Sequence, residues 1–207
     1  MTKLLRDLGI AAIAAIAGLG IAYAITRAPK NPVKQPSSIQ EILTENPTPQ
    51  VQEPVGNFTP TRIHQAHDYR AGRTANVDEI VLHTTEGTPL GAETWLTSAS
   101  GLEVSAHYLV WPNGDIVQMV NPADTAWHVR GHNARSVGIE IAGYFNRPIT
   151  NQQVTRTAEL VSHLLNQYDL QPTAIRAHSQ LDPSRRRDPG TENFNRVITA
   201  VNQDRNR

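Results

Sequence analysis

Apolar residues gather in three short runs between residues 77 and 190, and each run carries one polar residue that is able to do chemistry. The runs and their polar residues are 79–83 with His83, 137–141 with Glu140, and 173–178 with His178. Short runs rich in aliphatic and β-branched residues predict buried strands. Because a strand holds its side chains rigidly, adjacent strands could build one site from residues that are distant in sequence.

Two further runs predict a β-hairpin. Residues 105–111 and 115–120 alternate apolar and polar positions, and Asn113-Gly114 stands between them. An Asn-Gly pair in this position is a strong signal for the tight turn of a hairpin. The hairpin makes the predicted sheet mixed, with antiparallel as well as parallel neighbours.

Three segments predict helices in the same part of the chain. Residues 90–97 form the first, and Thr150 begins the second, because Gln153 follows it in the pattern of a capping box. The third helix follows residues 188–190. The apolar positions of the last two helices recur at helical spacing: Val154, Ala158, Val161, Leu164, Leu165 and Tyr168, then Phe194, Val197, Ile198 and Val201. We therefore predict an α/β (or α+β) fold, with a mixed central β-sheet flanked by helices on both faces.

The N-terminal residues 1–27 predict a transmembrane or signal helix. An uncharged run at 8–25 follows Lys3 and Arg6, and as a helix it would span about 27 Å, close to the hydrocarbon thickness of a bilayer. A cleaved signal peptide is one interpretation, because residues 22–24 have the small-x-small form of a cleavage site. We favour an uncleaved signal anchor, because the run is longer than the apolar part of most signal peptides.

Residues 28–59 predict a linker, and residues 60–207 a folded domain. The linker contains six prolines among Gln, Ser, Thr and Asn, a composition typical of an extended spacer. The domain is long enough to bury an apolar core. We expect it to be a monomer.

Composition excludes several kinds of chemistry. The formal net charge is zero, so electrostatics give no support for nucleic acid as a partner. Cysteine is absent, which excludes disulfides, thiolate metal ligands and a cysteine nucleophile. The last lysine is Lys34, so no lysine can act in the folded domain.

The remaining candidates are imidazoles and carboxylates. His83 and His178, together with Asp188, could form a metal site with an open position, although by spacing alone each could be an ordinary polar residue at the end of a strand. Glu140 stands in the middle of an apolar run, so its carboxylate either faces a polar cavity or is buried at high cost. The alternative is that Glu140 faces solvent from an edge strand.

Taken in order, these segments resemble the zinc-dependent N-acetylmuramoyl-L-alanine amidases, the domain shared by amidase-type phage lysozymes, cell-wall recycling amidases and peptidoglycan recognition proteins. The resemblance covers about residues 63–201. It is carried by six ordered motifs, at 81–87, 104–108, 114–118, 126–128, 136–140 and 178–190.

The resemblance implies one zinc ion in a groove and assigns a role to each candidate. The metal ligands would be His83, His178 and Asp188, and the catalytic glutamate would be Glu140. Some phage enzymes of the family place a tyrosine where this chain has Ala106, so the chain is more similar to the glutamate-using branch. The implied mechanism is an attack on the lactyl carbonyl by zinc-activated water, with Glu140 as the proton carrier.

One position departs from the family pattern. Active members commonly have a lysine eight residues after the second ligand, and this chain has Arg186. Arginine keeps the positive charge and can donate to an oxyanion, but its planar group is larger and aims differently. We expect Arg186 to point into the site.

The other histidines and the nearby tryptophan have more open roles. Trp127 could stack on substrate or fill the rim of the core. His128 could line the groove and contact substrate, or hydrogen-bond a loop. We expect His107 to be structural, and His132 and His163 to lie on the surface.

The sequence thus predicts an exported zinc amidase, anchored to the membrane through residues 8–25 or secreted after cleavage, that cuts the peptide stem from the glycan of peptidoglycan. A non-catalytic peptidoglycan-binding module is the alternative from another class, and an amidase acting on another N-acylated peptide is a third. Alanine and glycine fill ten of the eighteen positions of the apolar run, which raises the further hypothesis of a phage-type endolysin released from the membrane on a signal.

Overall fold

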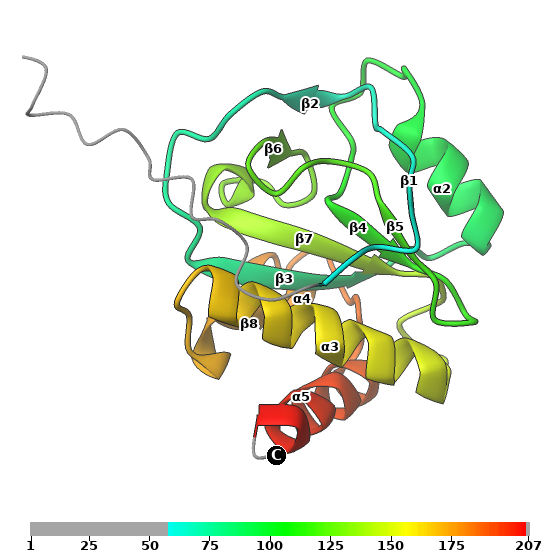
Figure 1. Ribbon diagram of the computed structural model, residues 1–207. Coiled ribbons are helices and arrows are strands. Elements are labelled where there is room, and N and C mark those ends of the chain that lie inside the picture. Colours follow the sequence, from blue (N-terminus) through cyan, green and yellow to red (C-terminus); the bar gives the residue numbers. More distant parts are fainter. Residues whose placement is uncertain (1–57, 206–207) are drawn as a thin grey trace, which may run out of the picture. The chain divides into compact units, whose positions relative to one another are not determined.

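The computed structural model describes residues 58–205 (Figure 1). The predicted N-terminal helix at 1–27 and nearly all of the predicted linker at 28–59 lie outside the described residues. Among residues 58–205, no helix is long and apolar enough to cross a membrane.

A six-stranded mixed sheet forms the centre of the described part of the chain. Its strands lie in the order β1-β5-β4-β7-β3-β8, and every neighbouring pair is parallel except β4 and β5. The bounds in spatial order are β1 (Arg62–Ile63), β5 (Ile116–Gln118), β4 (Tyr108–Val110), β7 (Ser136–Ile141), β3 (Glu79–Thr84) and β8 (Ile175–Ala177). A separate antiparallel pair joins β2 (Tyr69–Arg70) to β6 (Thr125–Ala126). The predicted hairpin is thus the antiparallel pair β4–β5.

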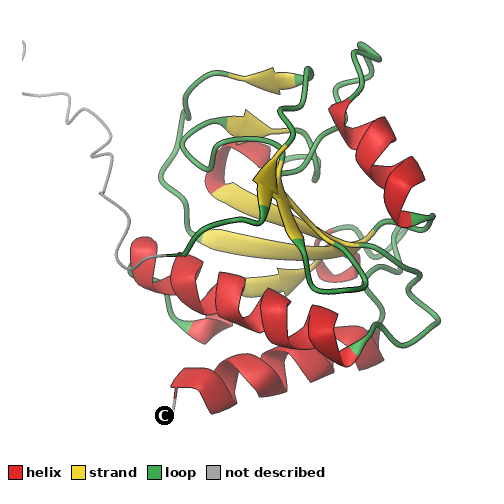
Figure 2. Cartoon of the chain, turned by 45° about the vertical axis from the view of Figure 1, so that its right-hand side comes forward, coloured by secondary structure: helices red, strands yellow, loops and turns green. Residues whose placement is uncertain are grey.

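Helices cover both faces of the sheet, as the sequence predicts (Figures 1 and 2). On one face α3 (Asn151–Gln167) and α5 (Thr191–Arg205) pack on the larger apolar cluster, which includes Leu82 and Ile139. On the other face Leu96 of α2 (Pro89–Thr97) belongs to a smaller cluster with Leu109 and Met119 of the hairpin region. Three short helical turns complete the fold: η1 (Asn133–Arg135), η2 (Pro172–Ala174) and α4 (His178–Leu181).

Strand register decides which side chains reach the second face. The central strands β3 and β7 pair in parallel, with Leu82 opposite Ile139 and His83 opposite Glu140. Successive side chains point to opposite faces of a sheet. Since Leu82 and Ile139 face α3 and α5, both His83 and Glu140 face away from those helices.

The predicted element bounds are right at the centre of the fold and too long in three strands. The predicted strands 105–111 and 115–120 shorten to β4 and β5. The N–H groups of Ser105 and His107 donate to the backbone oxygens of Trp127 and Gly138 at 3.0 and 3.1 Å. The backbone oxygen of His107 accepts from both Met119 and Val120, at 2.8 and 3.3 Å, so the regular pairing of the hairpin ends there. The predicted strand 173–178 shortens to β8. Its first residues form η2, which Pro172 favours because its fixed φ suits the first position of a helical turn. His178 therefore does not end a strand but begins α4.

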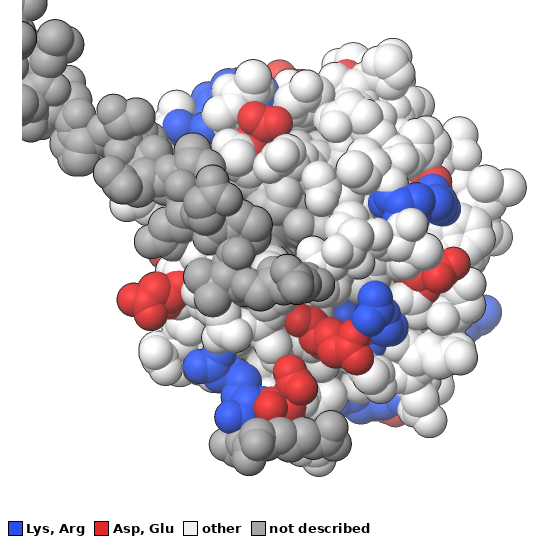
Figure 3. Space-filling model, viewed as in Figure 1, with Lys and Arg blue, Asp and Glu red and all other residues white. Residues whose placement is uncertain are grey.

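Charged side chains are scattered over the described surface. On the face shown in Figure 3, acidic and basic residues alternate, and no broad patch of one sign is present among the described residues drawn there.

Candidate active site

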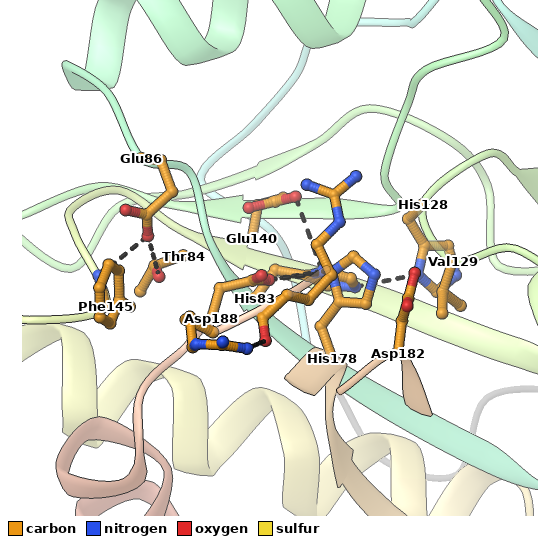
Figure 4. A network of polar contacts seen from close by, with 12 residues as sticks. His83, Thr84, Glu86, His128, Val129, Glu140, Phe145, His178, Asp182 and Asp188 are labelled. Atoms are coloured by element: carbon orange, nitrogen blue, oxygen red, sulfur yellow. Dashed lines mark hydrogen bonds and ion pairs between the residues drawn. The ribbon is translucent and has the colours of Figure 1, made fainter. Parts of the chain in front are cut away.

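Three side chains from separate elements converge at the end of β3 (Figure 4). His83 lies near the end of β3, His178 begins α4, and Asp188 lies in the loop before α5. Nδ1 of His83 is 2.9 Å from Nδ1 of His178 and 3.2 Å from Oδ2 of Asp188, and His178 Nδ1 is 3.0 Å from the same oxygen. All three residues are buried.

This donor set fits a divalent cation. One potential ligand atom from each residue lies within 4.8 Å of the other two. Burial lowers the pKa of His83, which favours the neutral imidazole that a metal requires. Burial alone would raise the pKa of the Asp188 carboxyl, but hydrogen bonds with His178 and His83 outweigh it and hold that pKa below its usual range. Two imidazoles and one carboxylate match the ligands of catalytic zinc sites.

The loop that carries Asp188 is held at both ends. Its first part is fastened by the backbone N–H of Arg186, which donates to Asp182 O at 2.9 Å, and its last part by the N–H of Ser179, which donates to Asp188 O at 2.9 Å. Gly190 then has a positive φ of 82°, and a Cβ there would be 2.0 Å from the carbonyl oxygen of Phe145. Glycine is therefore required for the chain to turn away directly after the carboxylate.

Glu140 lies beside the three converging residues. Its strand β7 is central, between β4 and β3, so the alternative of a solvent-facing edge strand is wrong. Oε1 is 4.0 Å from His83 Nδ1, and Oε2 is buried without a hydrogen-bond partner among the described residues. Burial and the nearby charge of Asp188 raise the pKa of Glu140 to about 8. An unpaired buried carboxylate is costly to a fold and is therefore typical of a functional position.

These residues form the floor of a cavity of about 630 Å³. Arg186 also lines this cavity, with an exposed side chain whose positive charge opposes the rise in the pKa of Glu140. Apolar side chains also line the cavity, among them the exposed Trp95 and Leu102. The cavity thus offers a substrate both polar and apolar side chains.

Of the remaining candidate residues, two line the cavity and one is buried in the interior. Trp127 lines the cavity, and the Arg70 guanidinium lies 6.0 Å from the centre of its ring. His128 also lines the cavity, and its Nδ1 is 3.1 Å from Nε2 of His83. His107 is fully buried and accepts a hydrogen bond from the backbone N–H of Gly138 at 2.9 Å, consistent with a structural role.

Two histidines expected at the surface are partly exposed there, and each has a contact that was not predicted. His132 contacts Glu79 through Nδ1 and Oε2 at 2.7 Å, and its side chain is 27% exposed. His163 stacks on Phe58, with ring centres 5.2 Å apart. The helical pattern of α3 places His163 beside its apolar face, and Phe58, whose contact could not be read from the sequence, covers it.

Two residues that support the site, Glu86 and Ser136, were not predicted from the sequence. Glu86 lines the cavity, and its Oε1 accepts hydrogen bonds from Thr84 Oγ1 at 2.7 Å and the N–H of Phe145 at 2.9 Å. Ser136 is fully buried beside His128. The sequence carries one signal for the place of His128. Gly138 lies inside a buried apolar strand, and a glycine there often marks a close approach by another group.

Comparison with known proteins adds an independent finding. A family model described as N-acetylmuramoyl-L-alanine amidase matches residues 73–191. N-acetylmuramoyl-L-alanine amidase A of Achromobacter lyticus is 42% identical over 65 residues, which cover 31% of this chain and 36% of that protein. The 1,6-anhydro-N-acetylmuramyl-L-alanine amidase AmpD of Haemophilus influenzae is 34% identical over 110 residues, covering 48% of this chain and 60% of that protein. The chain therefore spans less than two thirds of the length of either relative.

The fold has a counterpart among solved structures. The crystal structure of a selenomethionine AmpD derivative matches with a TM-score of 0.62, over 70% of this chain and 96% of that chain. The identity is 24%, so this likeness concerns the fold.

Proposed function

Because the chain belongs to the N-acetylmuramoyl-L-alanine amidase family, we propose that it hydrolyses the amide bond between the lactyl group of N-acetylmuramic acid and L-alanine in peptidoglycan. One observation carries the proposal beyond family membership. His83, His178 and Asp188 converge within 4.8 Å, next to a glutamate whose buried oxygen has no partner among the described residues. A chain that only bound peptidoglycan would not require that costly carboxylate.

In this proposal a zinc ion is held by His83, His178 and Asp188. When bound, zinc polarises a carbonyl oxygen and lowers the pKa of a water molecule toward neutrality. Burial favours the neutral form of His83, and hydrogen bonds favour the ionised form of Asp188, which are the forms that a metal requires of these two ligands. All proposed ligands come from one chain, which supports a monomer as the working unit.

Glu140 is the proposed proton carrier. A cation beside it favours the ionised carboxylate, which then takes a proton from the attacking water. The water oxygen bonds to the lactyl carbonyl carbon, the carbon–nitrogen bond breaks, and Glu140 passes its proton to the amino nitrogen of L-alanine. The products are a free lactyl carboxylate and a peptide with a new amino terminus.

Arg186 has the proposed role that a lysine has in the family pattern. Its exposed side chain lines the cavity close enough to Glu140 to affect the charge of that carboxylate. A guanidinium there can donate to the carbonyl oxygen as negative charge develops on it. Trp127 and His128 also line the cavity, and we assign them contacts with the substrate.

The site of action in this proposal is the cell wall. The apolar run at 8–25 would anchor the chain at the membrane and direct the domain outward, or would be removed after export. The substrate lies outside the membrane, which supports export. The alanine- and glycine-rich run also supports reversible anchoring, as in a phage-type endolysin: fractionation should find the chain in the membrane before the membrane potential is collapsed and outside it afterwards. Retention in the membrane throughout would exclude such release.

The reaction can be tested on isolated peptidoglycan. We expect the full chain with zinc to expose new L-alanine amino groups, and mass spectrometry of the products should find intact glycan strands separated from intact stem peptides. Products cut within the glycan or within the stem would contradict the proposed bond. Binding to peptidoglycan without any cleavage would instead favour the non-catalytic module, and Arg186→Lys would then be the first variant to assay.

A further inference from the structure

The ring of His128 lies against β7 at the position where that strand has no side chain. A Cβ at Gly138 would be 2.5 Å from Cγ and Nδ1 of the His128 ring, far inside van der Waals contact. The backbone of His128 is also fixed, because Asn133 Oδ1 accepts hydrogen bonds from the N–H groups of His128 and Val129 at 2.9 and 2.7 Å. The imidazole is therefore held in one place by the strand and the loop together.

The two ring nitrogens of His128 contact different groups. Nδ1 is 3.1 Å from Nε2 of His83, and the two rings meet edge to face at 87°. Nε2 is 3.2 Å from Oγ of Ser136. The Ser136 hydroxyl is buried, and it donates to the backbone oxygen of His132 at 2.8 Å. A continuous line of hydrogen bonds thus joins a backbone carbonyl to His83.

The carbonyl at one end fixes the direction of every bond in this line. A carbonyl can only accept, so the single proton of Ser136 goes to His132, and Ser136 Oγ must accept from His128 Nε2–H. A neutral imidazole carries one proton, and a histidine binds a metal ion in that neutral form. His128 then has a bare Nδ1, which accepts from His83 Nε2–H. His83 is left with a bare Nδ1, and that nitrogen faces His178 and Asp188.

We propose that His128 and Ser136 are positioning residues that set the tautomer of His83, so that His83 Nδ1 is presented to the metal without a proton. This inference rests on the proposed zinc-dependent function and deepens it. Groups behind a metal-binding histidine commonly fix the orientation and tautomer of its ring. Here the group next to His83 Nε2 is the imidazole of His128. Its Nδ1 can accept a hydrogen bond from His83 only while its proton is on Nε2, and that proton needs an acceptor. Ser136 supplies that acceptor.

Loss of the Ser136 hydroxyl would remove this constraint. His128 would have no acceptor for a proton on Nε2 and could carry it on Nδ1 instead. That proton would point at Nε2 of His83, which would have to accept it, and the His83 proton would move to Nδ1. The nitrogen meant for the metal would then be blocked in part of the population, and zinc affinity would fall.

The test is a double-mutant cycle on the zinc dissociation constant of the full chain, measured by competition with a chromogenic chelator. We expect His128→Ala to weaken zinc binding about 10- to 100-fold, the usual effect of removing a partner behind a metal ligand. Ser136→Ala should weaken it by a smaller factor. The double variant should bind zinc no more weakly than His128→Ala alone, because Ser136 acts only through His128. Ser162→Ala is the matched control, since it removes a buried hydroxyl that has no partner among the described residues, in α3.

A conservative variant separates tautomer control from packing. His128→Asn offers an acceptor near the place of Nδ1 and does not depend on Ser136. Its zinc affinity should lie closer to the wild type than that of His128→Ala, and adding Ser136→Ala to it should have no effect. Wild-type zinc affinity in Ser136→Ala, or independent losses from Ser136 and His128 that multiply, would overturn the inference. A wild-type chain that binds no zinc would overturn the proposed function too, so the two failures can be distinguished.

Discussion

At the scale of single residues, the site brings together buried titratable groups, each of which would destabilise the fold if it were buried alone. His83, His178 and Asp188 are all buried, and Glu140 has a carboxylate oxygen with no hydrogen-bond partner among residues 58–205. A buried carboxylate with a pKa near 8 is poorly suited to a folded protein without a compensating cation. The proposed zinc ion would supply that cation, and the carboxylate would then accept a proton from the attacking water.

The role of Glu140 as proton carrier predicts a loss of turnover without a loss of metal. Glu140→Gln keeps the shape of the side chain and removes its ability to take a proton, so kcat should fall about 10²- to 10⁴-fold. The zinc dissociation constant should change little, because Glu140 is not one of the three proposed ligands. Steady-state kinetics on peptidoglycan fragments and chelator competition measure the two quantities separately.

Asp188→Ala is the matched comparison for Glu140→Gln. It removes a proposed ligand, so zinc affinity and activity should fall together. Full activity in both variants would contradict the assignment of the site while leaving the fold intact.

At the scale of elements, α2 is tied to the sheet by a partly buried ion pair. The carboxylate of Glu93 in α2 accepts hydrogen bonds from the Arg62 guanidinium of β1 and, at 2.8 Å, from Nε1 of Trp111. The hydrogen bonds from Arg62 hold the pKa of Glu93 at about 2, although burial acts in the opposite direction. Trp95 lies in α2 and Leu102 follows it, so this ion pair also helps to position two apolar residues of the cavity lining.

A depressed pKa at Glu93 predicts how stability depends on pH. The folded pKa lies below the unfolded one, so the stabilisation is present above about pH 4.5 and is lost as the pH falls toward 2. Relative to Glu93→Gln, the wild type should be more stable by about 1 to 2 kcal/mol at pH 6, and the difference should shrink toward pH 2. The expected difference is smaller than the whole pKa shift implies, because the Arg62 side chain is 42% exposed and solvent screens the pair. Urea unfolding of both proteins in chelator, from pH 2 to 7, measures this difference. A difference that stays constant over that range would show that the charge of Glu93 is not what stabilises the fold.

The loop before α5 gives a second prediction at this scale. Gly190→Ala would place a methyl group 2.0 Å from the Phe145 oxygen at a positive φ, so the loop must shift and Asp188 must shift with it. We expect weaker zinc binding, by about tenfold or more, together with lower stability. Gly72→Ala is the matched control, because Gly72 also has a positive φ but nothing within 4 Å of the added Cβ. It should lower stability modestly and leave the zinc dissociation constant unchanged; an equal loss of zinc affinity in both variants would contradict the account.

At the scale of the whole molecule, much of the described fold could be predicted from pattern alone. Buried strands, the Asn-Gly hairpin and the capped helix at Thr150 are all determined by local chemistry, and the structure has each of them. Strand ends were less predictable, because the pairing of Ser105 and His107 with distant backbone groups decides where β4 begins. The helical turn at Pro172 and the start of α4 at His178 also shorten a predicted strand, and both depend on the residues next to them in the chain.

The candidate site also has a part that the sequence predicted and a part that it did not. Motif order identified His83, Glu140, His178 and Asp188, and the parallel register of β3 and β7 brings the first two to one face. The support from Ser136 through His128 could not be predicted, because it depends on a loop returning to lie on a strand. Gly138 indicates in the sequence that some group lies close to β7, but a glycine alone does not identify that group as His128.

The central claim is a zinc-dependent cut at the bond between muramic acid and L-alanine. The most direct test follows release of L-alanine amino groups from peptidoglycan by the full chain, first with zinc, then with a chelator, and then with zinc restored. The account predicts release with zinc, loss of release with chelator, and recovery when zinc returns. Release that continues unchanged in chelator, from protein shown to be free of metal, would contradict it.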